Sequence, residues 1–317
     1  MVYRSAHVEM FCAFLALGVP SFAQQGGVQQ SQIERARQLG VMRDTREIPG
    51  VPVGPSLPQS EGGQDLDSFG IQQMLVCGPE RARYFRVFGE VSGFVTNNVG
   101  LSRRNPSADS FLVGNFGLEY RRPLTRRFQV DVGFQAAMFR YNEFGQLNFN
   151  SMDVGAGLTY HSDKLGGVDI AARYNFNALQ GASSGDTFYR NHTITLGAEK
   201  VFPFSKAHHA VLGVSGRAGF TEPRSSERHE IGAYAGYHIE VIPRLEFDFG
   251  YRYSYYIYSA GGRRDHNQTA SIATRYWFTD WFSISASSFY VWDHSNEEAL
   301  SYNAGTLGGA MMFLMRF

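Results

Sequence analysis

The side chains in this sequence that could do chemistry fall into two groups, a few histidines and a larger set of charged residues. His161 stands close to Asp163, and His208 is followed by His209, each in a segment with the composition of a short turn. Histidines in turns are usually solvated, so neither place predicts a metal site. No phosphate-binding loop, zinc-ligand spacing or nucleophile elbow is present. The sequence therefore predicts neither a resident metal nor a cofactor.

The charged residues are more informative, because beyond residue 84 they alternate with apolar residues. In one segment Leu245, Phe247 and Phe249 are separated by Glu246 and Asp248. Only a β-strand has a period of two, so such a segment has one apolar and one polar face. The alternation predicts an all-β domain over residues 84–317, with about twelve antiparallel strands. They start near residues 84, 110, 127, 148, 167, 187, 209, 229, 244, 266, 281 and 300.

Composition excludes several other classes of protein. Lys and Arg together number 29, as do Asp and Glu, so no basic surplus suggests a nucleic-acid partner. Charged residues are only 18% and aromatic residues 15%, the reverse of what disordered chains show. Beyond the first 25 residues no apolar run approaches the ~18 residues of a membrane-spanning helix.

The N-terminus has the pattern of an export signal. Arg4 precedes an apolar stretch from Met10 to Val19, and the small residues Ser21 and Ala23 follow it. A basic start, a short apolar run and small residues at the last and third-last positions predict a signal peptide over residues 1–23. A buried N-terminal helix is the alternative interpretation.

Residues 24–83 differ in texture from the rest of the chain. Four prolines favour an extended connector, and the segment is too short and too polar to bury a core. We therefore expect a flexible leader. Cys12 would leave with the signal peptide, so Cys77 would be a lone cysteine and the mature chain would hold no intrachain disulfide. The prolines are Pro49, Pro52, Pro55 and Pro58.

The segments between the predicted strands differ at the two ends of the sheet. One end has short turns near residues 122–126, 161–166, 201–208, 242–244 and 278–281. The other has segments that are on average longer and richer in Asn, Ser, Gly and Arg: 98–109, 141–148, 177–187, 221–228, 258–266 and 293–300. This asymmetry is typical of a transmembrane up-and-down barrel with short periplasmic turns and longer extracellular loops.

The apolar faces carry no Asp, Glu, Lys or Arg at mid-strand, where Arg or Lys in lipid would cost about 2–4 kcal/mol. A soluble barrel would show the same exclusion, so the placement of aromatic residues decides. They gather at both ends of the strands, which predicts two interfacial girdles. Near the short turns are Tyr120, Phe128, Tyr160, Tyr276, Trp277, Phe278, Trp281 and Phe282. Near the longer loops are Phe139, Tyr141, Phe176, Phe188, Tyr189, Tyr255, Tyr258, Tyr290 and Trp292.

The last strand places Met311, Phe313, Met315 and the terminal Phe317 on one face. A terminal Phe that closes an alternating strand resembles the insertion signal of the bacterial outer-membrane β-barrel (porin-like) superfamily. The resemblance covers residues 84–317 and identifies no narrower family. It implies Phe313, Met315 and Phe317 as the insertion signal, and a location in the bacterial outer membrane with the leader and C-terminus periplasmic. The implied partners are outer-membrane lipids, lipopolysaccharide and the barrel-assembly machinery.

An enzyme in such a barrel would need a nucleophile and an oriented base together at the outer rim. His192, on the face of Ile194 and Leu196, is the best-placed histidine. Its expected neighbours on adjacent strands are Phe176 and Phe220, which leaves no serine or carboxylate within reach. The sequence favours a barrel that is not an enzyme, with a lipid hydrolase as the weakest alternative.

The inward face indicates a narrow porin for passive diffusion of small hydrophilic solutes or ions. Inward glycines, among them Gly117, Gly213 and Gly308, supply no side chain and would either leave room in the lumen or permit close approach. Small inward residues favour the pore. The rival hypothesis is a non-conducting anchoring or loop-displaying barrel, in which the inward charges pair and close the lumen. Predicted pore-lining residues near mid-depth are Glu90, Asp153, Arg173, Arg217 and Arg252. A mostly acidic periplasmic vestibule would be lined by Asp131, Asp169, Glu199, Glu240, Glu246 and Asp248.

Overall fold

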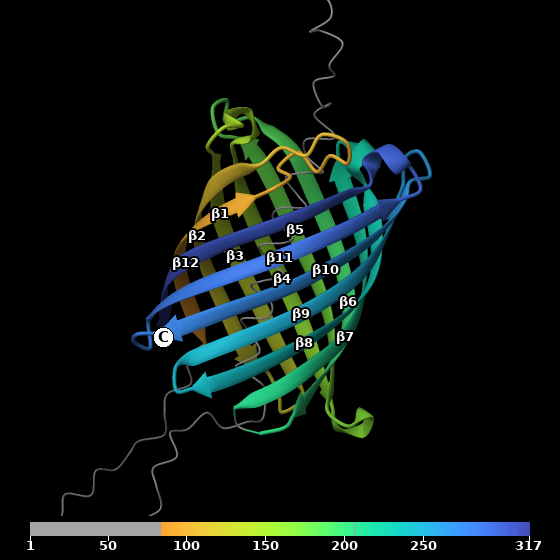
Figure 1. Ribbon diagram of the computed structural model, residues 1–317. Coiled ribbons are helices and arrows are strands. Elements are labelled where there is room, and N and C mark those ends of the chain that lie inside the picture. Colours follow the sequence, from red (N-terminus) through yellow and green to blue (C-terminus); the bar gives the residue numbers. More distant parts are fainter. Residues whose placement is uncertain (1–83, 206) are drawn as a thin grey trace, which may run out of the picture.

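The computed structural model describes residues 84–205 and 207–317, which form a closed β-barrel (Figure 1). Its twelve strands follow one another around the barrel in sequence order, each antiparallel to the next, and β1 pairs with β12 to close the ring. The predicted up-and-down barrel is confirmed. Residues 1–83, with the predicted signal peptide, the leader and Cys77, lie outside the described residues. Within residues 84–205 and 207–317, no helix is long and apolar enough to cross a membrane.

Every strand begins within two residues of the start that the alternation predicts. The strands are β1 Phe85–Thr96, β2 Asp109–Pro123, β3 Phe128–Tyr141, β4 Phe149–Ser162, β5 Val168–Gly181, β6 Thr187–Pro203, β7 His208–Glu222, β8 Arg228–Ile242, β9 Leu245–Tyr258, β10 Arg264–Trp277, β11 Phe282–Ser295 and β12 Tyr302–Arg316. Four short 3-10 segments lie in the connections: η2 Gly145–Leu147, η3 Asp163–Leu165, η4 Arg224–Ser226 and η5 Glu298–Leu300.

The connections at the two ends of the barrel differ less than the sequence predicts. The predicted loop 177–187 shrinks to 182–186, because β5 continues to Gly181 and pairs with β4 there. Polar residues such as Asn177 gave this stretch the composition of a loop, but Asn177 faces the barrel interior and is buried. The segment 97–108 remains the longest connection in the barrel, and the structure folds it over one end (Figure 1).

The outer surface of the last strand has the predicted apolar face. Met311, Phe313, Met315 and Phe317 are each about half exposed or more. The backbone N–H of Phe317 donates to the carbonyl of Phe85 over 2.9 Å, and the N–H of Phe85 donates to the Phe317 carbonyl over 3.1 Å. The terminal residue therefore completes the seam between β1 and β12.

The predicted aromatic girdles need correction at several positions. At the short-turn end Phe128, Tyr276 and Trp281 are exposed on the outer face, as expected, but Trp277 is buried and points inward opposite Ser283. At the other end Phe139, Tyr141, Tyr189 and Tyr258 also share the inward face. The composition of a strand end does not show which of its residues point inward and which point outward. Counting by twos from the inward Asp131 places Phe139 and Tyr141 inward as well.

A closed barrel predicts heat-modifiable migration in SDS gels. A closed ring of strands leaves no free edge at which detergent could begin to unravel the sheet, so the folded protein stays compact until it is boiled. We expect the unheated protein to run faster than the boiled protein. Identical migration of the two samples, from a preparation with strand content verified by circular dichroism, would contradict the closed ring.

Candidate functional site

The five predicted pore residues all lie on the inward face, on five different strands. The partners of the arginines come from the adjacent strand or the next one along, so the charges are distributed around the wall in local pairs. Glu90 lies on β1 and is half-buried, and Asp153 on β4 accepts a hydrogen bond from the side-chain amide of Asn177 over 3.0 Å. The three arginines, Arg173 on β5, Arg217 on β7 and Arg252 on β9, each form an ion pair with an acid.

Two of these arginines share one carboxylate that the sequence reasoning did not select as a site residue. Glu230 on β8 lies between them and is almost completely buried. Its Oε1 accepts from Nη2 of Arg252 over 2.5 Å, and its Oε2 lies 3.4 Å from Nη1 of Arg217. The hydroxyl of Ser254 donates to the same carboxylate over 2.8 Å. This network links β7, β8 and β9 on the inside of the barrel. The register between β7 and β8, which pairs Arg217 with Glu230, would have predicted this network.

The third arginine reaches its partner across an intervening strand. Asp131 on β3 is the register partner of Gly157 on β4, which is the partner of Arg173 on β5. Arg173 forms an ion pair with Asp131. A Cβ at Gly157 would lie only 2.6 Å from Oδ1 of Asp131, so only glycine leaves the carboxylate this space. The structure thus joins one predicted pore residue to one predicted vestibule residue.

The other predicted vestibule acids also have partners in the wall. Asp169 bonds to His161 over 2.6 Å and Asp248 to His238 over 2.7 Å. Glu199 accepts a hydrogen bond from the hydroxyl of Tyr234. Of the remaining two, Glu240 accepts from the backbone N–H of Arg244 over 2.9 Å, and the buried Glu246 lies opposite Arg275 in the register. Alternation identified the face of these acids, but their pairing depends on which strands are neighbours.

Of the two roles expected for the inward glycines, close approach and not open room holds at three positions. A Cβ at Gly117 would coincide with the ring of Phe88, and a Cβ at Gly308 with the ring of Phe94. Tyr234 occupies the same space beside Gly213. These glycines let an inward aromatic ring lie flat against the neighbouring strand. They therefore bring the rings into contact with the wall and do not widen the lumen.

The end of the barrel with the longer connections contains an apolar cluster that the sequence reasoning missed. Inward side chains of β2 to β6 pack together there, and Phe139 stacks on Phe149 with ring centroids 4.4 Å apart. Counting by twos from the inward polar residues of each strand would have identified these side chains, because they lie on the same inward face. The buried members are Val99, Phe111, Val113, Phe139, Tyr141, Phe149, Leu179 and Tyr189.

The segment 97–108 is part of this packing and lies in the barrel mouth. Val99 is buried within the apolar cluster, while Leu101 packs against a second cluster formed by Phe289, Val291, Tyr302 and Ala304 of β11 and β12. Because Val99 and Leu101 contact inward residues on either side of β1, the segment folds into the mouth and not away from it.

Polar contacts fix the same segment. The side-chain amide of Asn98 donates to the carbonyl of Asn303 over 2.8 Å, and its oxygen accepts from the N–H of Ser102 over 2.9 Å. Leu101 has a φ of 52°, in the left-handed region that non-glycine residues seldom adopt. In this backbone conformation the side chain of Leu101 packs against the second cluster. The segment is therefore held in one conformation by apolar packing at two points and by hydrogen bonds to β12.

The mouth is charged on the side of β8 to β11. Arg263 donates to both oxygens of Asp265, over 2.9 and 2.6 Å, and Asn267 donates to Asp293 over 2.7 Å. Burial lowers the pKa of the Arg263 guanidinium, but its hydrogen bonds to Asp265 and the nearby acidic groups prevail, so that its pKa lies above the ordinary value. The guanidinium of Arg228 lies over the ring of Tyr256 at 4.2 Å. The mouth at this end of the barrel thus has one apolar wall and one charged wall.

The histidines with potential for chemistry are placed as follows. His192 is the register partner of Phe176 and Phe220, as predicted, and its Nδ1 lies 2.8 Å from the hydroxyl of Tyr174. His208 faces outward near Tyr237, whereas His209 faces inward and stacks on His238 at 4.8 Å. Among residues 84–205 and 207–317, no group of three or more His, Cys, Asp or Glu side chains could hold a metal ion.

No protein-family model matches the chain, and no curated protein matches it in sequence. The structure is similar to an outer membrane channel from Pseudomonas putida F1, with a TM-score of 0.54, 13% identity, and coverage of 75% of this chain and 99% of that one. The chain has the fold of the bacterial outer-membrane β-barrels. Other similar barrels are a KdgM porin in complex with disordered oligogalacturonate (TM-score 0.41, 8% identity, covering 71% and 98%) and the outer membrane channel DcaP of Acinetobacter baumannii (0.40, 11%, covering 73% and 97%).

The shared carboxylate gives this outer-membrane barrel fold a testable weak point. Replacing Glu230 with Gln leaves Arg217 and Arg252 without their common counter-charge. We expect the free energy of unfolding to fall by about 3 kcal/mol, the lower end for breaking a buried ion pair, because both arginines keep partial access to water. The midpoint of denaturant unfolding measures this loss.

The matched control is Glu119→Gln on β2. Glu119 pairs with Arg86 over 2.6 Å but is about one-third exposed. An exposed pair contributes at most about 1 kcal/mol. Equal losses for the two variants would show that the buried network has no special role in stability.

Proposed function

We propose that this barrel is a narrow channel for passive diffusion of small hydrophilic solutes or ions. The observation that carries the proposal is the arginine wall, three arginines projecting inward from alternate strands: Arg173, Arg217 and Arg252 on β5, β7 and β9. The guanidinium-bearing side chain of Arg173 is 43% exposed, so the surroundings of this charge are not fully occupied by the protein. Inward charges of this kind set ion preference in channels.

The geometry of the mouth supports a restricted channel. One wall is packed with aromatic side chains and covered by segment 97–108, while the wall of β8 to β11 is charged. A hydrophilic solute would pass along the charged wall, because apolar side chains offer its polar groups no hydrogen bonds. Segment 97–108 would then limit the size of what passes.

The second candidate is a non-conducting barrel that anchors or displays loops. The pairing of Arg217 and Arg252 with Glu230 favours it, since paired charges can close a lumen as a structural network. Conductance of the folded protein in planar bilayers separates the two functions. A protein that never conducts would support the scaffold.

Several further features belong to the proposal. Phe313, Met315 and Phe317 would be read as an insertion signal by the barrel-assembly machinery. The longer connections would face the cell exterior, next to lipopolysaccharide, and both the leader and the C-terminus the periplasm. We infer no enzymatic role, because the aromatic neighbours of His192, Tyr174 and Phe176, supply neither a serine nor a carboxylate. These inferences rest on the fold and on the residue types.

Removing the arginine wall should change ion preference. In a narrow lumen charges interact more strongly than in bulk water. Arg173→Ala alone, and the triple variant with Arg217→Ala and Arg252→Ala, should shift the reversal potential in a salt gradient toward cations. The freed Asp131 and Glu230 would add to this shift.

Two further variants complete the test. Glu90→Gln with Asp153→Asn should shift the reversal potential toward anions. Arg122→Ala, an exposed arginine at the short-turn end of β2, should leave it unchanged. If the wild type conducts and neither the arginine set nor the acid set moves the reversal potential, the constriction lies elsewhere in the barrel.

Loosening segment 97–108 should enlarge the conductance. Val99→Asp places a carboxylate in the apolar cluster, where an unpaired charge costs several kcal/mol, so the segment should leave the mouth. Single-channel recordings should show larger and noisier currents. Thr125→Asp, in an exposed turn at the other end, is the control. A Val99→Asp channel with wild-type conductance would show that this segment does not restrict the pore.

A further inference from the structure

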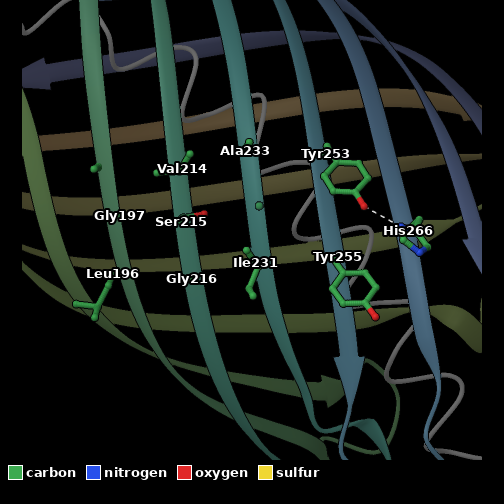
Figure 2. Close-up of a pocket in the computed structure, with 12 residues that line it drawn as sticks. Leu196, Gly197, Val214, Ser215, Gly216, Ile231, Ala233, Tyr253, Tyr255 and His266 are labelled. Carbon is green, nitrogen blue, oxygen red and sulfur yellow. Dashed lines mark hydrogen bonds between the residues drawn. The ribbon is translucent and has the colours of Figure 1, made fainter.

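A groove runs across the outer surface of the barrel from β6 to β10 (Figure 2). Its volume is about 800 Å³, within the range of ~300–1,000 Å³ of pockets that bury a ligand. The groove is almost entirely apolar except at the end where His266 lies. One register row along it consists of Leu196, Gly216, Ile231, Tyr255 and His266, and the next of Ala198, Val214, Ala233 and Tyr253.

The groove exists because small residues stand between large ones on the outer face. Gly216 has no side chain, and a Cβ built there would meet nothing within 4 Å. Its register neighbours Leu196 and Ile231 are both more than half exposed and form the flanking ridges. The floor is therefore a trough with open space above Gly216, which a larger side chain at this position would fill.

The groove descends from the rim of the barrel toward its middle. His266 lies next to the beginning of β10, whereas Leu196 lies in the middle of β6. Barrel strands are tilted by roughly 35–45°, so positions in one register row lie at different depths. In the orientation proposed above, one end of the groove would lie at the headgroup level and the other in the hydrocarbon. This is the path of an acyl chain whose headgroup lies at the rim.

The rim end of the groove carries one guanidinium and two imidazoles. Arg264 lies two positions before His266 on the same outward face, and His294 is the register partner of His266 on β11. The hydroxyl of Tyr253 lies 2.7 Å from Nδ1 of His266 and holds the imidazole in place (Figure 2). Within the described part of the chain, the guanidinium of Arg264 has no ion pair. An anionic group could accept hydrogen bonds from these side chains together.

A second Arg, His and Tyr arrangement of the same kind lies on β5 and β6, but its arginine forms an ion pair. On β6, Nδ1 of His192 lies 2.8 Å from the hydroxyl of Tyr174, and Arg190 precedes His192 by two positions. There, however, Arg190 forms an ion pair with Glu222 over 3.0 Å. The β6 arrangement is therefore neutralised by its own chain, and the β10 arrangement is not.

We propose that this groove binds a phosphorylated, acylated glycolipid of the outer leaflet, of the lipid A type. A phosphate would lie on Arg264, His266 and His294, and one acyl chain would fill the trough over Gly216. Charge complementarity favours this occupant over a second copy of the barrel. A two-fold contact would place the cationic rim near its own copy, where like charges repel. The proposal rests on the orientation proposed above but not on conduction.

Native mass spectrometry of the full-length protein, folded in detergent and stripped of lipid, tests the headgroup site. The probes are diphosphorylated lipid A, dephosphorylated lipid A and phosphatidylglycerol. The variant Arg264→Ala/His266→Ala/His294→Ala should bind diphosphorylated lipid A about tenfold more weakly, as expected for loss of a charged hydrogen bond. Its binding of the dephosphorylated form should not change. Arg190→Ala/His192→Ala is the matched control and should bind both forms like the wild type.

The groove is tested separately by filling it. Gly216→Leu should weaken binding of both forms of lipid A, whereas Gly89→Leu, at an outward glycine of β1 that also has open space, should not. Heat-modifiable migration verifies that each variant is folded.

Three results would overturn the proposal. One is equal binding of diphosphorylated lipid A by the wild type and the triple variant. Another is a preference of the wild type for phosphatidylglycerol. The third is a protein dimer, free of lipid A, that Gly216→Leu dissociates.

Discussion

The constraint on which the structure depends is that no backbone polar group can remain unpaired in hydrocarbon. A sheet meets this condition only when its first and last strands pair. Here β1 and β12 pair along their whole length, and the terminal Phe317 adds the last hydrogen bonds to Phe85. Once the ring is closed, alternation assigns each residue to lipid or lumen. The outer face then has to be apolar, and all remaining chemistry is confined to the inside and to the two rims.

Inside the barrel, the contacts between side chains depend on how far each side chain extends over the neighbouring strand. Neighbouring strands lie ~4.8 Å apart, so a side chain that has to bridge two strands needs a small residue beneath it. Gly157 provides this space between Asp131 and Arg173. Gly117, Gly213 and Gly308 provide it for inward aromatic rings. Glycine in these strands therefore determines which side chains meet, and through them where the lumen charges are held.

The sequence allowed the strands, their number and their starts to be predicted, because the period of two is a property of single strands. It also placed Arg173, Arg217 and Arg252 on the inward face. It could not give the pairing of Arg217 and Arg252 with Glu230, which depends on the register between strands. The girdle assignments of Phe139 and Tyr141 were wrong because they relied on position along the strand without its phase. Segment 97–108 folds into the mouth because Val99 and Leu101 pack against side chains of distant strands. The sequence of this polar stretch alone does not show those contacts.

Alternation also connects the lumen to the lipid surface through shared backbone. Gly216 lies in the floor of the outer groove, and the next residue, Arg217, belongs to the inner ion-pair network. Ile231 and Glu230 have the same relation on β8. A lipid that orders the outer face of β7 to β9 would therefore restrain the strands that hold the shared carboxylate. Conversely, the network of Arg217, Glu230 and Arg252 fixes the relative positions of these strands, and this keeps the groove in shape. Strands β7 to β9 thus hold the network of Arg217, Glu230 and Arg252 on their inner face and part of the outer groove on the other, so a movement of these strands would affect both.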